Sequence, residues 1–536
     1  MNKIYIFISF FVFIVTAINA QKIYYVDPVP IENYNPQGCG TSVDAACNTI
    51  NDAIYTFLNA TSPTNTTTQP FVVNLLQGAY FSNQSAPGVN DTISVYGLNI
   101  TIQSYGYAAD SNNSAPIVLN GTYLSKITLF KVNGNTSSTT SLTFNNIQFD
   151  SFYNSILYAN SLDGPFSLYL NNCSITNMPS ASTGLIYTNA YYQRSSIFLT
   201  NSIVKNNNGS VIFSITRANF DITNSTIGSN TGVYLLTLQT CTVNVVNSVI
   251  SNNTMSSNYT LSPLFDIQNT VFNMINSSAN ANIGGSYVFS FKASTLSLSN
   301  CSFNMNNYPT GSYYGVLYLT SSYTTIKSSV FNYNYAISGG AIYNQNGGLT
   351  IYNSTFYNNQ ARYGSQITHL GNTLSIYDSL VVQNQSLTLL PQSLLSISSA
   401  NVYIKNTQIQ ATSTIGTTFS VINCNSAIVS FTQSFISTFS SYSNLTCSSC
   451  TTINDGESNN PLLQCPQSSS EQDSSSYHDH PYYPPIFRVI YLILISFFSI
   501  LLFIGLIIIL VCICKQRKER KHCYQEISNY DVVQKV

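Results

Sequence analysis

Residues 349–359 read Leu-Thr-Ile-Tyr-Asn-Ser-Thr-Phe-Tyr-Asn-Asn, and this eleven-residue pattern recurs twelve times through the middle of the chain. In each copy, apolar residues alternate with polar ones, an Asn or a similar residue follows, and another apolar residue comes three positions later. The copies are 23 to 29 residues apart. A repeat of this length that tolerates insertions is typical of a solenoid of stacked coils.

The alternation predicts a β-strand with one buried face, followed by a turn that Asn and Ser accommodate. The Asn stands two residues after the last inward side chain, so we expect it to point inward as well. Equivalent residues of stacked coils lie about 4.8 Å apart, which would let the amides bond to each other. The predicted asparagine ladder consists of Asn146, Asn172, Asn201, Asn224, Asn247, Asn276, Asn300, Asn353 and Asn406, with Ser328, Asp378 and Gln433 at the three remaining positions.

The fold class predicted from this pattern is all-β, a parallel β-helix over residues 71–450, with one transmembrane α-helix nearer the C-terminus. Residues 71–135 carry apolar runs that suggest three further coils before the twelve copies. Residues 21–70 form the predicted N-terminal cap. Within it Ile50, Ala53, Ile54, Phe57 and Leu58 fall on one helical face, which predicts a helix over the open end of the solenoid.

Two apolar segments predict the cell compartment. Residues 1–20 read as a signal peptide, with a first membrane anchor as the alternative. Residues 489–514 contain 26 residues without a charge, enough to span a bilayer, and five basic residues follow by position 521. We therefore expect a type I single-pass protein of the plasma membrane, or of an endolysosomal membrane. Residues 451–488 would form a Ser- and Pro-rich stalk, and 515–536 a cytoplasmic tail.

Nine of the 12 cysteines precede the predicted span. Cys39 and Cys47 flank a short loop and are expected to form a disulfide. The spacing of Cys447 and Cys450 also occurs in redox and zinc motifs, but no second ligand pair accompanies it, so we favour structural disulfides. The pairing of these two and Cys465 stays open. Because nine is odd, at least one thiol is left over or pairs between chains.

Two further cysteines, Cys173 and Cys301, follow the Asn of their repeat directly and are interpreted as small turn residues. The chain has 18 Asn-X-Ser/Thr sequons, all before the predicted span. Glycans are expected at Asn59, Asn65, Asn83, Asn90, Asn120, Asn135, Asn258, Asn384 and Asn444. Five more sequons coincide with predicted ladder positions, and we expect them to stay unmodified because their side chains would point inward: Asn172, Asn224, Asn276, Asn300 and Asn353.

The arrangement resembles the right-handed parallel β-helix of the pectin-lyase-like superfamily, over about residues 30–450. Residues 331–342 and 356–367 also resemble the Phe-x-x-Asn and Gly-Gly-Ala-Ile repeat of chlamydial polymorphic outer-membrane proteins, with Gly-Ser replacing Gly-Gly in the second copy. Those proteins are implicated in adhesion. The resemblance therefore implies a right-handed coil and a surface role, although this chain departs from them in its expected C-terminal helix.

Charge argues against two classes of function. Only 7% of residues are charged and the net charge is −1, which excludes a basic nucleic-acid surface. Enzymes of the superfamily would need paired carboxylates or acidic residues that bind calcium. No Glu lies between Asn33 and Gly456, and the aspartates of residues 141–440 share no register in neighbouring coils: Asp150, Asp163, Asp221, Asp266 and Asp378.

No catalytic residue, metal site or cofactor is therefore predicted. The single histidine of the coils, His369, is expected at the surface or in a turn. We expect a non-enzymatic surface glycoprotein that binds an extracellular glycan, protein or neighbouring cell. Its 39 Tyr residues could form columns on a flat face for such a ligand, or could simply fill strand positions because Tyr favours β-structure. A passive cell coat and a divergent polysaccharide lyase or hydrolase are the alternatives. Tyr524 and Ile527 fit a sorting signal for an endocytic adaptor, which would add uptake.

Overall fold

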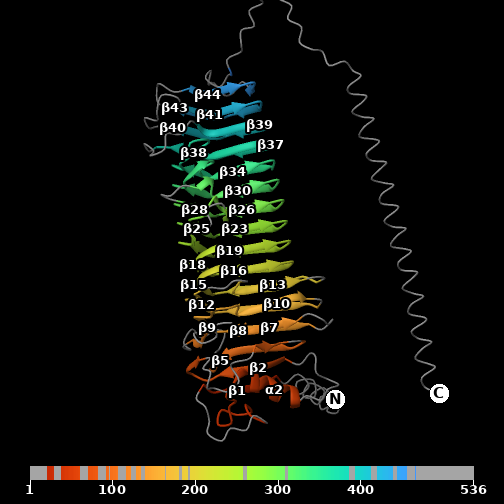
Figure 1. The fold of residues 1–536 in the computed structure, drawn as a ribbon. Helices are drawn as coiled ribbons and strands as arrows, with labels where there is room; N and C mark the ends of the chain where they lie inside the picture. Colours follow the sequence, from red (N-terminus) through yellow and green to blue (C-terminus); the bar gives the residue numbers. More distant parts are fainter. Residues whose placement is uncertain are drawn as a thin grey trace, which may run out of the picture. The chain divides into compact units, whose positions relative to one another are not determined.

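The computed structural model describes residues 21–28, 38–60, 70–81, 92–95, 97–106, 116–121, 128–133, 139–162, 164–179, 184–190, 193–256, 262–307, 312–384, 393–411, 419–438, 443–454 and 465. All of them belong to the first of the chain's two units, Met1–Gln467. This unit is an all-β parallel solenoid, as the sequence predicts, and its turns pile up in chain order (Figure 1). Every strand pairs in parallel with its counterpart one turn away, as β17 does with β14 and β20.

Each turn contributes one strand to each of three faces. Face 1 contains β1 (Lys22–Val26), β2 (Pro70–Leu75), β5 (Asn99–Ser104), β8 (Thr140–Asn145), β11 (Phe166–Asn171), β14 (Ser195–Thr200), β17 (Ala218–Thr223), β20 (Thr242–Val246), β24 (Val271–Ile275), β27 (Thr295–Ser299), β31 (Tyr323–Lys327), β35 (Leu349–Tyr352), β42 (Ile428–Thr432), β45 (Thr451–Asn454) and the second halves of β37 (Ile367–Tyr377) and β39 (Ser393–Lys405). Face 2 is a separate 14-stranded sheet of β3 (Ala79–Phe81), β6 (Ile117–Asn120), β9 (Ile147–Asp150), β12 (Ser174–Thr176), β15 (Ile203–Lys205), β18 (Thr226–Gly228), β21 (Val249–Ser251), β25 (Ser278–Asn280), β28 (Ser302–Asn304), β32 (Val330–Asn332), β36 (Thr355–Tyr357), β38 (Leu380–Gln383), β40 (Gln408–Ala411) and β43 (Phe435–Thr438). Face 3 contains β4 (Ile93–Ser94), β7 (Phe130–Asn133), β10 (Leu157–Leu162), β13 (Ile186–Ala190), β16 (Asn208–Thr216), β19 (Thr231–Gln239), β23 (Pro263–Gln268), β26 (Tyr287–Lys292), β30 (Leu317–Thr320), β34 (Ile342–Gln345), the first halves of β37 and β39, β41 (Ser420–Asn425) and β44 (Ser443–Ser448). Between faces 2 and 3, β22 (Thr254–Met255) pairs with the start of β19, and β29 (Ser312–Tyr314) pairs with β33 (Ala336–Ser338).

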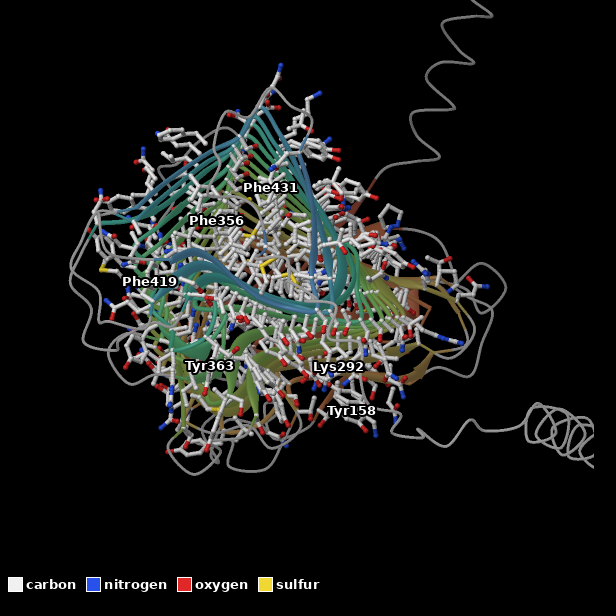
Figure 2. The ribbon with its side chains drawn as sticks, turned by 90° about the horizontal axis from the view of Figure 1, so that it is seen from above. Tyr158, Lys292, Phe356, Tyr363, Phe419 and Phe431 are labelled. Carbon is white, nitrogen blue, oxygen red and sulfur yellow. A yellow bond between two sulfur atoms is a disulfide. The ribbon has the colours of Figure 1, made fainter. Side chains whose placement is uncertain are left out.

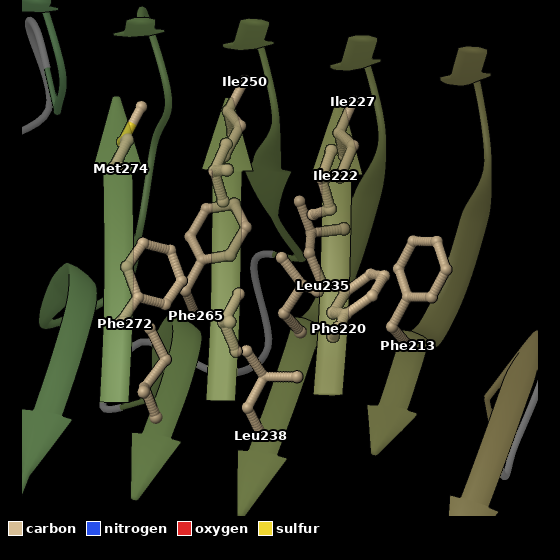
Figure 3. Close-up of a cluster of buried hydrophobic side chains, with 14 of the residues drawn as sticks. Phe213, Phe220, Ile222, Ile227, Leu235, Leu238, Ile250, Phe265, Phe272 and Met274 are labelled. Atoms are coloured by element: carbon tan, nitrogen blue, oxygen red, sulfur yellow. The ribbon is translucent and has the colours of Figure 1, made fainter. Parts of the chain in front are cut away.

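The cross-section is triangular, with the apolar core inside the three faces (Figure 2). Strands such as β8 and β11 alternate buried and half-buried residues along their length, as period-2 patterning requires. Identical side chains stack on each other in successive turns. The ring of Phe331 lies nearly parallel to those of Phe303 and Phe356, with centroid distances of 4.7 and 4.9 Å. Figure 3 shows a stretch of this core, where Phe220, Phe265 and other apolar side chains line an internal cavity of about 10 Å³. With no polar lining, a space this small is expected to stay dry.

The inward direction predicted for the asparagine ladder is wrong, although some of its bonds form: Nδ2 of Asn172 donates to Oδ1 of Asn146 (3.0 Å), and Nδ2 of Asn300 donates to Oδ1 of Asn276 (3.2 Å). Its members stand at the corner between faces 1 and 2 with φ between 43° and 57°, and all but Asn146 are exposed. Because the backbone is left-handed at this position, the side chain of the Asn points outward and the side chain of the next residue points inward. That next residue is the buried one: the backbone N–H of Ser202 donates to Oγ of Ser225 (3.0 Å), and Ser225 repeats the contact with Ser248 (3.1 Å). Cys173 and Cys301 occupy this same buried position.

A buried asparagine ladder does exist, six residues later, at the corner between faces 2 and 3. In it, Nδ2 of Asn230 donates to Oδ1 of Asn253 (2.9 Å) and to the carbonyl oxygen of Val204 (3.0 Å), and its backbone N–H donates to the same Oδ1 (3.1 Å). Each amide thus satisfies all its hydrogen-bonding capacity inside the core, which removes the cost of burying it. The members are Asn207, Asn230, Asn253, Asn282, Asn306, Asn334 and Asn359, none more than 1% exposed.

The N-terminal end is covered by helix α2 (Ile50–Ala60), and its Phe57 stacks on Phe71 of the first turns at 4.0 Å. The predicted helical face is confirmed except for Leu58, which is 39% exposed because the helix turns it away from β1 and β2. The solenoid already begins at β1, inside the predicted cap. Residues 71–135 make two turns rather than three, because long insertions separate β3 from β4 and β5 from β6.

Three disulfides hold the ends of the solenoid. Cys39 and Cys47 are joined beside the cap, with an S–S distance of 2.07 Å. At the other end Cys450 pairs with Cys424 of β41, and Cys447 pairs with Cys465. The two residues of the Cys-x-x-Cys segment therefore bond to other partners rather than to each other. Of the cysteines that the structure describes, Cys173, Cys241 and Cys301 are free and buried.

The predicted stalk begins too early, because β45 (Thr451–Asn454) still pairs with β42 of face 1 and Cys465 is bonded to Cys447. Outside the described residues lie the signal peptide 1–20, the other residues of the predicted stalk 451–488, the span 489–514 and the tail with Tyr524 and Ile527. In the part of the chain that the structure describes, no helix is long and apolar enough to cross a bilayer.

Candidate ligand-binding face

Face 3 carries several stacked tyrosines on its outward side. Its outward residues form two adjacent columns that follow the register of the parallel pairs. The first column contains Lys131, Tyr158, Tyr187, Ser214, Thr237, Asp266, Ser290, Tyr318 and Tyr343. The second contains Asn160, Asn189, Thr216, Gln239, Gln268, Lys292, Thr320 and Gln345. The first column thus has two pairs of tyrosines separated by Ser214, Thr237, Asp266 and Ser290, and the second consists mostly of uncharged hydrogen-bonding side chains.

Four tyrosines cluster on this face where β26, β29, β30 and β34 meet. The rings of Tyr287 and Tyr318 are stacked at 4.4 Å, and those of Tyr318 and Tyr343 at 5.6 Å. Tyr314 packs against Tyr343 from the side, with centroids 4.5 Å apart and planes tilted by 56°. A second stacked pair, Tyr158 and Tyr187, lies nearer the N-terminus at 4.8 Å. We call the four residues Tyr287, Tyr314, Tyr318 and Tyr343 the tyrosine cluster.

The stacking direction decides what a ligand would meet. Rings from successive turns lie nearly parallel, at 11° and 16° to each other, so their faces are turned toward one another along the solenoid axis. A ligand lying along face 3 would contact ring edges and hydroxyl groups, and ring faces only at the ends of the stack. The cluster is therefore suited to a ligand that combines apolar patches with many hydroxyl groups.

The phenols of Tyr287 and Tyr343 stay protonated at neutral pH. Burial, with the neighbouring Tyr318 and Asp266, raises the pKa of Tyr287, and burial with Tyr314 and Tyr318 raises the pKa of Tyr343 to about 12. These hydroxyls can thus donate as well as accept hydrogen bonds. One charged pair borders them: Nζ of Lys292 lies 3.6 Å from Oδ1 of Asp266, whose other oxygen accepts a hydrogen bond from Gln268 at 2.8 Å. Tyr158 and Lys292 point out from the same side of the triangle (Figure 2).

The aspartates that an enzyme would need are dispersed over the molecule. Asp150 ends a strand of face 2 and accepts hydrogen bonds from Thr176 and Asn177. Asp221 lies on face 1, Asp266 on face 3, and Asp378 at the corner between faces 1 and 2. Each of these four is held by its own local partners, among them Asn244 and Asn406, and no two share a face. Asp163 lies outside the described residues.

The expectation that His369 lies at the surface or in a turn is wrong. His369 is a fully buried residue of β37, and its Nδ1 lies 2.9 Å from Nδ2 of Asn344 one turn earlier. Burial lowers its pKa to about 4, against the opposing effect of the Asn372 and Gly371 backbone, so the ring is neutral at pH 7. The described residues contain no group of three or more His, Cys, Asp or Glu side chains placed to hold a metal.

The predicted glycan sites fall into three groups. Asn59 and Asn384 are exposed and Asn120 is half-buried. Asn65, Asn83, Asn90, Asn135 and Asn258 lie outside the described residues, and Asn444 lies on β44. The five sequons expected to be hidden, at Asn172, Asn224, Asn276, Asn300 and Asn353, are exposed instead because of the left-handed corner described above.

Comparison with known proteins shows no family for this chain. No family model and no curated protein matches the chain. Among solved structures it is similar to the A-module of the mannuronan C-5 epimerase AlgE4 of Azotobacter vinelandii, with 12% identity and a TM-score of 0.34, over 81% of this chain and 100% of that one. A rhamnogalacturonan lyase aligns with 10% identity and a TM-score of 0.26, over 66% of this chain and 82% of that one. With TM-scores this low, neither likeness carries an argument about this chain.

Proposed function

We propose that the solenoid is a non-catalytic binding module at the cell surface and that it recognises carbohydrate along face 3. The observation that carries this proposal is the tyrosine cluster beside a column of polar, mostly uncharged side chains. Hydroxyl-rich ligands are bound by neutral donors and acceptors together with aromatic carbon, and face 3 repeats both at each of several turns. The dispersal of the aspartates supports binding over turnover.

The cellular setting follows from segments outside the described residues. The apolar segments 1–20 and 489–514 support a type I single-pass protein whose solenoid faces outward, and Tyr524 with Ile527 would direct its uptake through an endocytic adaptor. In that setting, binding of carbohydrate on a neighbouring cell or particle amounts to adhesion or capture. The resemblance to chlamydial surface repeats is consistent with this role.

A glycan array probed with the purified chain tests the proposal. We expect a defined set of glycans to bind, and Tyr318→Ala to weaken the best of them at least about tenfold, because removing a central contact typically costs more than 1.4 kcal/mol. Tyr352→Ala is the matched control, since Tyr352 stacks on Tyr377 at 5.1 Å in the same way but on face 1. We expect that variant to bind like the wild type.

Two outcomes would favour the alternatives. No binding to any glycan, cell or particle would leave a passive coat protein. Turnover of polygalacturonan, measured by new reducing ends or unsaturated products with and without calcium, would indicate an enzyme and would contradict the reading of the aspartates.

A further inference from the structure

The exposed corner between faces 1 and 2 is a candidate site of modification. Five of its asparagines begin sequons: Asn172, Asn224, Asn276, Asn300 and Asn353. All five side chains are exposed, and their backbone φ of 43° to 53° directs them away from the core. The residue between Asn and Ser or Thr is the buried Ser or Cys of the corner, and the Ser or Thr itself lies outward at the start of a face 2 strand.

Sequons are kept apart from buried asparagines throughout the described residues. Twelve asparagines are buried, and none begins a sequon: Asn74, Asn146, Asn207, Asn230, Asn253, Asn282, Asn306, Asn307, Asn334, Asn344, Asn358 and Asn359. Since 18 of the chain's 64 asparagines begin sequons, about three of these twelve would be expected to do so at random. The fold helps to keep them apart, because the residue two positions after several ladder asparagines is itself buried, as Ala336 and Ala361 are.

The outward column at the start of the face 2 strands has an alternating composition. In register it reads Ser174, Ile203, Thr226, Val249, Ser278, Ser302, Val330 and Thr355. Where the turn carries a sequon, this position is the Ser or Thr that the sequon needs. At the three of these eight turns that lack a sequon, the position is apolar and exposed, at 41% for Ile203, 39% for Val249 and 40% for Val330. Each apolar residue thus lies between two sequon turns.

We propose that this corner carries a row of N-linked glycans at Asn172, Asn224, Asn276, Asn300 and Asn353. In the modification, Nδ2 of each asparagine bonds to the anomeric carbon of a lipid-pyrophosphate-linked oligosaccharide; the bond from that carbon to the phosphate oxygen breaks, the lipid pyrophosphate leaves and the amide loses one proton. The remaining amide hydrogen still allows the contact from Nδ2 of Asn300 to Oδ1 of Asn276, 3.2 Å away. The first sugars would cover Ile203, Val249 and Val330, which removes apolar surface from water.

This row also gives the solenoid an orientation. In a triangular cross-section the corner between faces 1 and 2 lies opposite face 3 (Figure 2). Glycans on that corner leave the tyrosine cluster free and keep other molecules from the opposite edge. The inference rests on the proposed passage through the secretory pathway, but it requires nothing of the ligand.

Glycopeptide mapping measures the occupancy of each sequon. The full chain is produced in a eukaryotic secretory host, and its glycans are released with a glycosidase in heavy-oxygen water, which marks each asparagine that carried one. We expect the five corner asparagines to be occupied. Two variants change the sequons without touching the buried corner residue. Val249→Thr creates a sequon at Asn247 and should add one glycan, and Thr226→Val should remove the glycan of Asn224 while carbohydrate binding stays unchanged.

The outcomes separate the two proposals. If Asn59 and Asn384 are occupied while the corner asparagines and the Val249→Thr site are bare, the glycan row is refuted and the apolar column would instead be free to dock a partner. If no sequon of the chain is occupied, both the row and the proposed surface location are overturned. Occupied corners with glycan binding abolished by Tyr318→Ala but not by Thr226→Val support both.

Discussion

Replacing Asn253 by Leu tests whether the buried asparagine ladder holds the turns together. Oδ1 of Asn253 accepts hydrogen bonds from the backbone N–H and from Nδ2 of Asn230, at 3.1 and 2.9 Å, and Nδ2 of Asn253 donates to the carbonyl oxygen of Ile227 at 2.9 Å. The change therefore leaves two buried donors and one acceptor without partners. At about 1–3 kcal/mol for each of these three groups, we expect the free energy of unfolding to fall by about 3–9 kcal/mol.

The matched control is Asn247→Leu, six residues earlier in the same turn. Asn247 stands at the exposed corner with φ of 49°, so its replacement should cost only about 1 kcal/mol, the preference of Asn over Leu for a left-handed backbone. Denaturant unfolding gives both losses, and hydrogen exchange should locate the Asn253→Leu effect in β18 and β19, because a solenoid is coupled mainly between neighbouring turns. Equal losses, or a larger loss for Asn247→Leu, would refute the assignment of the ladder.

Three further predictions concern other parts of the fold. Burial lowers the pKa of His369 to about 4, so between pH 6.5 and 4 the unfolded chain takes up a proton that the folded chain does not, and the wild type should lose about 3 kcal/mol of stability over this range. His369→Asn keeps an acceptor for Asn344 and should flatten this pH dependence in a series of unfolding measurements. Cys450→Ser breaks the bond to Cys424, and hydrogen exchange should then rise in β44 and β45 but not in β17 to β24; a uniform rise would contradict a local role for that bond. Phe57→Ala should destabilise the N-terminal turns by about 3–5 kcal/mol because it removes the stack on Phe71. Tyr55→Ala, on the exposed side of α2, should have no such effect, and similar unfolding midpoints for the two variants would show that the helix is not a cap.

The repeat and the strand alternation predict most of the fold, because a period of two and a recurring unit are properties of the backbone itself. The helix at residues 50–60 follows for the same reason. What alternation does not predict is the direction of a side chain at a corner. Strict alternation predicts that the side chains of Asn224 and its equivalents point inward, but a single residue with a left-handed backbone conformation reverses this direction.

A second signal in the sequence marks the actual ladder. An apolar residue stands three positions before each ladder asparagine, as in Val204 before Asn207, Phe303 before Asn306 and Phe356 before Asn359. The same spacing is the Phe-x-x-Asn element quoted above for two coils, and extending it to all seven would have identified the buried column. Cys424 as the partner of Cys450 had no such signal, because 26 residues of sequence separate two atoms of adjacent turns.

The candidate site was only partly within reach of the sequence. An abundance of Tyr predicts columns, but which tyrosines meet depends on the register of face 3 and on insertions between faces 2 and 3. Tyr314, for example, reaches the cluster from β29, which lies outside the main sheets. The burial of His369 depends equally on register, since it continues the inward position of Asn344.

Hydroxyl-radical footprinting of the tyrosines, with and without the best ligand from the array, tests most directly the claim that face 3 is the binding face. We predict that the ligand protects Tyr318 and Tyr343 from oxidation and leaves Tyr352 and Tyr377 of face 1 unchanged. Protection of the face 1 pair, with the face 3 tyrosines oxidised as in the free protein, would contradict the account.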